Sequence, residues 1–288
     1  MRNSYLLSAL MASGIAVFFS ACEEVGPNID FTIPDASLLD TTYVESTVEE
    51  PQQKVVFFED FTGVQCVNCP TAHNKTEELL DLYPNQLTVV AMHNYFAGAY
   101  SDSNEDYTIP EANEINDYIG PAPAWPAGFI DRKDFGSGNL YTLLVSNYQV
   151  FVEEQLPLVP PCNIYVSSSY DAAERRALIK VTVKYTEATT LENHLSVMLL
   201  ESGILDLQLT LSGIDEVYVH NHVLRDMLTP ATGVNLVGDK EPGRVFEKEF
   251  AITLPANWQS EEMEVIAFVH NFDPENKEVL QSAKTYLE

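Results

Sequence analysis

The stretch KVVFFEDFTGVQCVNCP, residues 54–70, decides how we expect the chain to fold. Its first eight residues form a short apolar run of the kind found in buried strands. A turn then leads to two cysteines three positions apart, Cys66 and Cys69. Apolar residues up to Pro84 follow at helical spacing, and residues 87–92 form a second short apolar run. We therefore predict a strand, the cysteine pair, a helix and another strand in this order.

This order resembles the opening of a thioredoxin fold. Two cysteines at this spacing on the first turn of a helix can close a small disulfide ring, and the helix N-terminus lowers the pKa of the first thiol. Cys66 would be the attacking thiol and Cys69 the resolving thiol. Asp60 lies where thioredoxins place a buried acid that helps to deprotonate the resolving thiol. Pro126, before the apolar run of residues 127–131, resembles the cis-proline that thioredoxins set against the disulfide.

Two features of the motif leave its chemistry open. Gln65 stands where active thioredoxins carry Trp, and Pro70 follows the second cysteine rather than lying inside the pair. The pair could exchange disulfides, or it could form a structural disulfide on a scaffold used for binding, and the fold alone does not decide between them. In either case we predict an α/β thioredoxin-like domain over residues 54–158, closed by a helix over residues 140–156.

The N-terminus has the pattern of a bacterial export signal. Arg2 is its single charged residue before Cys22, and the apolar part, residues 6–19, is shorter than the ~20 residues that a membrane span requires. Phe19-Ser20-Ala21-Cys22 resembles the lipobox of bacterial lipoproteins, although Phe19 departs from the usual Leu. We predict a signal peptide over residues 1–21 and lipid on Cys22. The alternative is an ordinary signal peptide in which this cysteine is incidental.

The segment after the signal peptide and the overall charge limit the possible partners. Residues 22–53 contain three prolines and many acidic, Ser and Thr residues with little hydrophobic pattern, so we predict a flexible acidic tether. The formal net charge of the chain is −28. This charge argues against nucleic acid as a partner and against a basic patch for anionic lipid.

Residues 159–288 are expected to form a second domain. Pro157, Pro160 and Pro161 mark its boundary, and beyond them apolar and polar residues alternate, as in residues 179–185. Seven short strands separated by turn residues predict an all-β, immunoglobulin-like sandwich. Cys162, left alone once Cys22 carries lipid and the other two cysteines pair, is expected to be a small buried hydrophobe. The expected strands cover residues 162–168, 179–185, 194–200, 217–224, 245–252, 263–271 and 279–286.

The stretch HNHVLR, residues 220–225, is the unusual segment of this second region. In a strand, His220 and His222 would point to the same face and could hold a metal as a pair. No third ligand is evident in the sequence, so we favour a polar sheet face and predict no metal site. His220, His222 and Arg225 remain candidate functional residues without a defined role.

As a set, these segments resemble the outer-membrane lipoprotein family of Bacteroidetes named after a 28-kilodalton outer-membrane protein. The resemblance implies an outer-membrane lipoprotein, often surface-exposed, with a thioredoxin-like domain followed by a β-sandwich. It implies no established biochemical activity. The two glutamates directly after Cys22 fit a surface-export signal of this bacterial group. The segments that carry the resemblance are residues 60–63, 66–70, 106–111, 126–132, 220–225 and 265–271.

Two hypotheses of function follow from the sequence. In the first, the Cys66/Cys69 pair exchanges disulfides with partner proteins. In the second, the chain is a non-enzymatic, adhesin-like binding protein of the cell surface, and the disulfide braces its first domain. In both, lipid on Cys22 anchors the chain to the outer membrane, with its body at the cell surface or, alternatively, at the periplasmic face. We expect an unidentified protein or glycan as partner, no cofactor and no nucleic acid.

Overall fold

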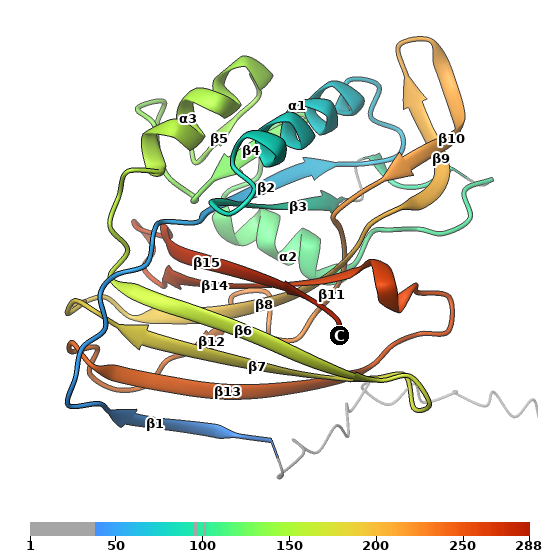
Figure 1. Cartoon of the computed structure of the whole chain (residues 1–288). Helices are drawn as coiled ribbons and strands as arrows, with labels where there is room; N and C mark the ends of the chain where they lie inside the picture. The colour runs from blue at the N-terminus through green and yellow to red at the C-terminus, as the bar shows by residue number, and fades with distance from the viewer. Residues whose placement is uncertain (1–37, 95–96, 101) are drawn as a thin grey trace, which may run out of the picture. The chain divides into compact units, whose positions relative to one another are not determined.

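The computed structural model describes residues 38–94, 97–100 and 102–288. The predicted signal peptide, the predicted lipidation site Cys22 and the first part of the predicted tether lie outside these residues. The described part is mostly β, with a large mixed sheet, a four-stranded sheet, a two-stranded hairpin and three α-helices (Figure 1).

The large sheet takes its strands from both predicted domains. These strands are β2 (Val56–Thr62), β3 (Leu87–His93), β4 (Ala127–Ile130), β5 (Tyr141–Thr142), β8 (Asn193–Glu201), β11 (Val223–Met227), β12 (Val234–Asn235), β14 (Met263–Asn271) and β15 (Val279–Tyr286). Their order is β15-β14-β8-β11-β3-β2-β4-β5, with β12 paired to β8. β3 is parallel to both β2 and β11, and the other pairs are antiparallel. The predicted boundary at residues 158–159 precedes β6, and the segments on its two sides meet at β3 and β11.

The four-stranded sheet takes three of its strands from the second segment and covers one face of the large sheet. It contains β1 (Asp40–Val44), β13 (Arg244–Thr253), β7 (Arg176–Tyr185) and β6 (Cys162–Asp171), in that order and all antiparallel. Buried and half-buried residues alternate along most of β7, which confirms the predicted period of two. Its buried side chains pack with residues of β8 and β14, so the two sheets face each other across one apolar core.

The prediction of a flexible tether is wrong from residue 40 onward, because residues 40–52 pair with or contact the four-stranded sheet. Asp40–Val44 forms β1 and pairs with β13. Lys184 then places its ammonium group 3.1 Å from a carboxylate oxygen of Glu45 and 2.7 Å from one of Glu49. The backbone N–H of Gln52 donates to the side-chain oxygen of Asn163 at 2.7 Å. The acidic and amide groups that suggested a solvated tether therefore have partners on β6 and β7.

Helices cover both faces of the sheet within the first segment. α1 (Cys69–Leu82) and α3 (Tyr148–Gln155) pack against one face of β2, β3 and β4, and α2 (Pro110–Ile119) packs against the other (Figure 1). The predicted helix over residues 140–156 is shorter than expected, because β5 and the 3-10 helix η2 (Val145–Asn147) occupy its first half. A second short 3-10 helix, η3 (Ser260–Glu262), precedes β14.

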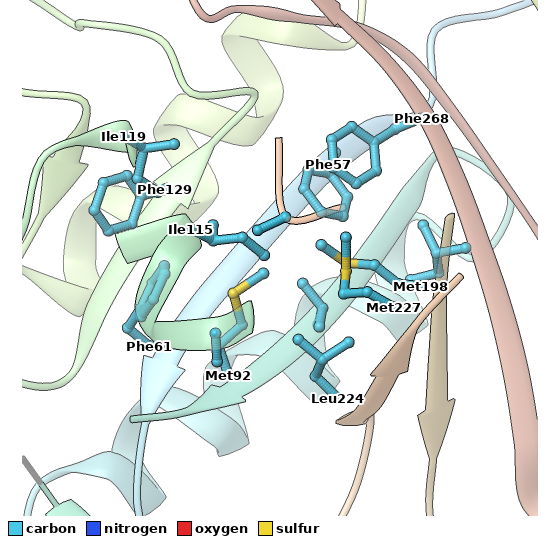
Figure 2. Close-up of a cluster of buried hydrophobic side chains, with 14 of the residues drawn as sticks. Phe57, Phe61, Met92, Ile115, Ile119, Phe129, Met198, Leu224, Met227 and Phe268 are labelled. Carbon is cyan, nitrogen blue, oxygen red and sulfur yellow. The ribbon is translucent and has the colours of Figure 1, made fainter. Parts of the chain in front are cut away.

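A large apolar core joins the two segments (Figure 2). Phe57 of β2 stacks on Phe268 of β14, with ring centroids 4.1 Å apart. Met198 of β8 and Leu224 of β11 belong to the same cluster, and Ile115 of α2 closes it. Because this cluster takes side chains from both sides of residue 158, the two segments stabilise each other.

The predicted strand over residues 217–224 is divided in the structure. β9 (Ile204–Thr210) and β10 (Gly213–His220) form a separate hairpin, and β11 begins only at Val223. Between them, His222 adopts a left-handed backbone conformation with φ of 54°. This turn ends the hairpin, so residues 217–220 belong to the hairpin and residues 223–224 to the large sheet.

Candidate functional site

The turn between β2 and α1 brings the two cysteines together. The N–H of Cys66 donates to the carbonyl of Gly63 at 3.0 Å, and the N–H of Cys69 donates to the carbonyl of Cys66 at 3.2 Å. Gly63 lies so close to the backbone of Ala97 that a Cβ atom would not fit there. α1 begins at Cys69, with Asn68 as its N-cap, so Cys66 lies in the turn just before the helix.

Cys66 and Cys69 form a disulfide, with Cα atoms 5.4 Å apart. The two sulfur-bearing residues differ in exposure: Cys66 is 8% exposed and Cys69 is 0% exposed. Both lie at the N-terminus of α1, where the partial positive charge of the helix dipole stabilises a thiolate. In chemical terms, an attacking thiolate from outside has better access to Cys66 than to Cys69.

A groove of about 300 Å³ lies beside the disulfide. It is lined by residues 65–68, by Ala97 and by residues 122–125. Trp125 packs against the disulfide cluster and stacks on Phe61 with ring centroids 5.6 Å apart. The peptide bond between Trp125 and Pro126 is cis, and β4 begins at the next residue. The groove is therefore a place where an extended partner segment could approach Cys66.

Asp60 is buried on the face of β2 that packs against α1. Its neighbours on this face, Val56 and Phe58, pack with Ala72 and Leu79 of the helix. Neither carboxyl oxygen of Asp60 has a hydrogen-bond partner among the described residues. Burial raises the pKa of this carboxyl group well above its usual range. Asp60 is therefore a buried carboxyl group that binds a proton more readily than an exposed one does.

His220, His222 and Arg225 do not converge on one site. His220 ends β10, where its ring nitrogen Nε2 lies 3.1 Å from the carbonyl of Leu207. His222 lies in the turn, with its Nδ1 atom 3.1 Å from Glu264. The expectation that His220 and His222 share a strand face is thus wrong, because the strand ends between them. Within residues 38–94, 97–100 and 102–288, no group of three or more His, Cys, Asp or Glu is placed to hold a metal ion.

Arg225 is held by charges and rings of the surrounding elements. Its Nη2 atom lies 2.6 Å from Glu105 and its Nε atom 3.3 Å from Glu201. The guanidinium group also lies over the rings of Tyr107 and Trp258, at 5.6 Å and 5.0 Å from their centroids. These contacts hold the loop before α2 against the large sheet, so Arg225 stabilises the fold.

Two further residues near Asp60 were not singled out from the sequence. His73 of α1 places Nε2 3.8 Å from the Asp60 carboxylate, and Tyr218 of β10 places its hydroxyl 2.7 Å from His73 Nδ1. His73 follows Cys69 by four residues, so the two share a helix face, and this spacing could have identified it. Tyr218 has no comparable signal, because only the packing of the hairpin brings it to α1.

Cys22, the predicted lipidation site, lies outside the described residues. Cys162 is a free, buried cysteine, as expected, and burial raises its pKa to about 12. No helix in the part of the chain that the structure describes is long and apolar enough to cross a membrane.

Comparison with solved structures finds proteins of similar fold. HBP35 of Porphyromonas gingivalis matches with a TM-score of 0.66 and 18% identity over 83% of this chain and 77% of its own. A protein of Agrobacterium tumefaciens matches with a TM-score of 0.50 and 12% identity over 82% of this chain and 96% of its own. A domain of the outer membrane lipoprotein Omp28 from Porphyromonas gingivalis is 19% identical over 46% of this chain and 91% of its own, at a TM-score of 0.30 that supports no structural argument.

Sequence comparison gives the family. No curated protein sequence matches the chain. The family model described as Outer membrane protein Omp28 matches residues 114–287, which is more than half of the chain. The match includes the second part of α2 (residues 114–119), the groove residues 122–125 and all strands from β4 to β15. The chain is therefore an outer-membrane protein that belongs to the Omp28 family.

Proposed function

We propose that the chain is a lipid-anchored outer-membrane protein whose Cys66/Cys69 pair exchanges disulfides with partner proteins. In this proposal Cys66 attacks the partner and Cys69 resolves the mixed disulfide. Asp60 would take the proton of Cys69, and Pro126, which follows the groove residue Trp125, would lie beside the partner chain. A thioredoxin-like portion, residues 54–158, would carry this site, followed by an immunoglobulin-like sandwich, residues 159–288.

The arrangement of the first segment supports the thioredoxin-like assignment. Parallel β2 and β3 are joined by α1, β4 and β5 follow as antiparallel neighbours, and helices lie on both faces. In thioredoxin folds, the active-site disulfide lies at the N-terminus of the helix that follows the central strand, as the disulfide does here. The facing sheets of the second segment support a sandwich, although two of its strands, β8 and β14, also face the core shared with the first segment.

The single observation that carries the proposal is the unequal placement of the two cysteines beside a groove. Cys66 borders the groove, whereas Cys69 is fully buried at the first position of α1. This asymmetry suits an exchange reaction, because the first sulfur must meet a partner and the second must be protected until the mixed disulfide forms. A purely structural bridge does not require an adjoining groove.

The experiment that tests the proposal traps the partner. Cells that produce the Cys69→Ser variant should accumulate mixed disulfides on Cys66, visible as heavier species that a reductant removes. The matched Cys66→Ser variant should accumulate none, because it lacks the attacking thiol. Absence of mixed disulfides in both variants, together with a reduction potential below about −300 mV for the purified protein, would contradict disulfide exchange.

One observation favours the alternative, a non-enzymatic binding protein. The β9–β10 hairpin exposes apolar side chains, with Leu211 81% and Val217 74% exposed. The hairpin contacts the disulfide turn, since the Gln208 side chain donates to the carbonyl of Cys66 at 3.1 Å. Under this alternative the disulfide supports a binding surface, and a Cys66→Ser/Cys69→Ser double variant that folds would bind its partner as the unaltered chain does.

The proposed anchor is tested separately from the chemistry. Cys22→Ala should release the chain from the membrane fraction, because a protein anchored by lipid loses its attachment with the acylated thiol. Protease treatment of intact cells tests exposure at the surface. Digestion of the unaltered chain supports the surface location, and full protection supports the periplasmic face.

A further inference from the structure

A second cavity, of about 200 Å³, lies apart from the groove beside Cys66 and shares none of its wall residues. Its walls come from four elements, β2, α1, β3 and β10, and they include Asp60 of β2, His73 and Glu77 of α1, and Tyr218 of β10. His222, in the turn after β10, completes it. The cavity therefore connects the buried acid behind the disulfide helix with the hairpin of the second segment.

Short contacts link the acid to the cavity through His73. The Nε2 atom of His73 lies 2.7 Å from Thr62 Oγ1 and 3.8 Å from the Asp60 carboxylate. On the other side of the ring, Nδ1 lies 2.7 Å from the hydroxyl oxygen of Tyr218. Exposure increases along this series, from 1% for the Asp60 side chain to 16% for that of His73, and Tyr218 is half-buried. The contacts thus lead from the interior toward solvent.

The surroundings keep His73 neutral, so that one ring nitrogen donates a hydrogen bond while the other accepts one. Burial, with a smaller contribution from His220, lowers the pKa of His73 to about 3. Burial also raises the pKa of the Tyr218 hydroxyl, with contributions from Asp60, Glu77 and Asp215. Several other titratable and charged groups surround Asp60 and His73. They are Glu77 of α1, Tyr148 of α3, His93 of β3, Asp215, Tyr218 and His220 of β10, and His222 of the turn. Arg225 of β11 contributes indirectly, because its charge helps to lower the pKa of His93.

We propose that His73 and Tyr218 relay protons between Asp60 and the cavity during disulfide exchange at the cysteine pair, an inference that rests on the proposed function. The two residues act through Asp60 and not on the sulfur atoms, so they are positioning residues. The separation of 3.8 Å between His73 and Asp60 must shorten for direct transfer. Such distances are often long in the resting state of an enzyme and shorten during reaction.

The relay belongs to the step in which Cys69 resolves a mixed disulfide on Cys66. The Cys69 thiol gives its proton to the Asp60 carboxylate, and the resulting thiolate attacks the sulfur of Cys66. A Cys66–Cys69 bond forms, the bond between Cys66 and the partner breaks, and the partner leaves as a thiolate, so Cys69 is oxidised and the partner sulfur is reduced. Asp60 then returns its proton to His73 Nε2, His73 passes the Nδ1 proton to Tyr218, and the Tyr218 hydroxyl proton goes to water in the cavity.

The resolving step can be measured without a natural partner. The purified full chain is reduced, cleared of reductant and mixed with 5,5′-dithiobis(2-nitrobenzoate). Cys66 attacks the reagent and releases one coloured thiolate in a first phase, and Cys69 releases a second when it resolves the mixed disulfide. The Cys69→Ser variant lacks the second phase and serves as the blank. Rates of both phases are recorded from about pH 5 to about pH 9, where a proton-transfer step shows its pH dependence.

Tyr218→Phe keeps the ring and removes the relay hydroxyl, and His73→Asn removes the imidazole. Each should slow the second phase by at least about tenfold and shift its pH profile, with the first phase unchanged. Added imidazole should restore part of the lost rate, which loss of a structural contact would not allow. Tyr83→Phe, the matched control at the other end of α1, removes a surface hydrogen bond to Glu153 and should change neither phase.

The proposal is overturned if both variants resolve the mixed disulfide within about twofold of the unaltered rate at every pH, without a response to imidazole. If the variants do not fold, the unaltered chain still provides a test in mixtures of light and heavy water. A relay through several hydrogen bonds predicts a curved dependence of the second rate on deuterium content, and a straight line contradicts it. Failure to trap partners in cells with an intact relay in this assay would contradict the proposed function alone.

Discussion

The two faces of β2 carry adjacent buried carboxyl groups in opposite surroundings. Glu59 lies on the face that meets the second segment and accepts three hydrogen bonds from Arg132, between 2.6 and 3.2 Å long. The same guanidinium group lies over the ring of Phe268, 5.1 Å from its centroid. Asp60 lies on the face toward α1 and has no hydrogen-bond partner within the described part of the chain.

This difference separates groups that hold the fold from groups that are available for chemistry. The Glu59 carboxylate is fixed in place by charge-assisted, bidentate hydrogen bonds from Arg132. A buried carboxyl group without a partner binds a proton more readily, since burial disfavours its charged form. One strand therefore provides a structural ion pair and a proton acceptor at neighbouring positions, and the alternation of side chains along β2 keeps them apart.

The largest effect should follow from breaking the ion pair on the Glu59 face. Arg132→Met leaves the Glu59 charge buried without a partner, and we expect the free energy of unfolding to fall by about 3–5 kcal/mol. Denaturant unfolding of the purified protein measures this change. The double variant Glu59→Leu/Arg132→Met removes both charges and should recover most of the loss. A loss of less than about 1 kcal/mol in the single variant would show that the pair does not stabilise the fold.

Replacing Asp60 on the other face should have a smaller effect of opposite sign, an increase in the stability of the folded protein. In the unfolded chain Asp60 ionises near pH 4, whereas its pKa in the folded protein is raised. The folded state therefore binds more protons between these two pKa values, and its stability falls as pH rises through that interval. Asp60→Asn removes this loss, so at about pH 8 the variant should unfold at a higher denaturant concentration than the unaltered chain.

The dependence on pH distinguishes this effect from a general change in packing. The stability difference between Asp60→Asn and the unaltered chain should shrink as pH falls toward about 4, because both side chains are then neutral. Asp81→Asn, which changes an exposed acid of α1, provides the matched control and should show no such trend. A constant difference across the pH range would contradict the raised pKa of Asp60.

Local pattern predicted several elements of both segments, although it missed α2 and β9 and merged parts of β10 and β11 into one strand. The apolar run before Cys66 gave β2, the cysteine spacing gave the disulfide, and the alternation in residues 179–185 gave β7. These features depend on neighbours within about ten residues, which a sequence records directly. The prediction that Asp60 is buried also holds, since its position in an apolar strand required it.

The pairing of distant elements could not be predicted in this way. Strand β14 is buried at every position because Val265 and Ala267 face the four-stranded sheet while Ile266 and Phe268 face the core shared with β2. Such a run of apolar residues indicates burial on both sides but does not identify what covers either side. The same limit applies to β11 beside β3 and to Tyr218 beside His73, contacts that depend on tertiary packing alone.

The smallest expected effect again concerns the Asp60 face. Thr62→Val keeps the shape and strand preference of the side chain but removes the hydroxyl group that bonds His73 Nε2 at 2.7 Å. We expect a loss of about 0.5–1.5 kcal/mol in denaturant unfolding, the usual contribution of a single neutral hydrogen bond. This face of β2 should therefore tolerate changes to its polar groups far better than the Glu59 face. A loss as large as that of Arg132→Met would mean that the contacts around Asp60 also hold the fold, and the distinction between the two faces would no longer stand.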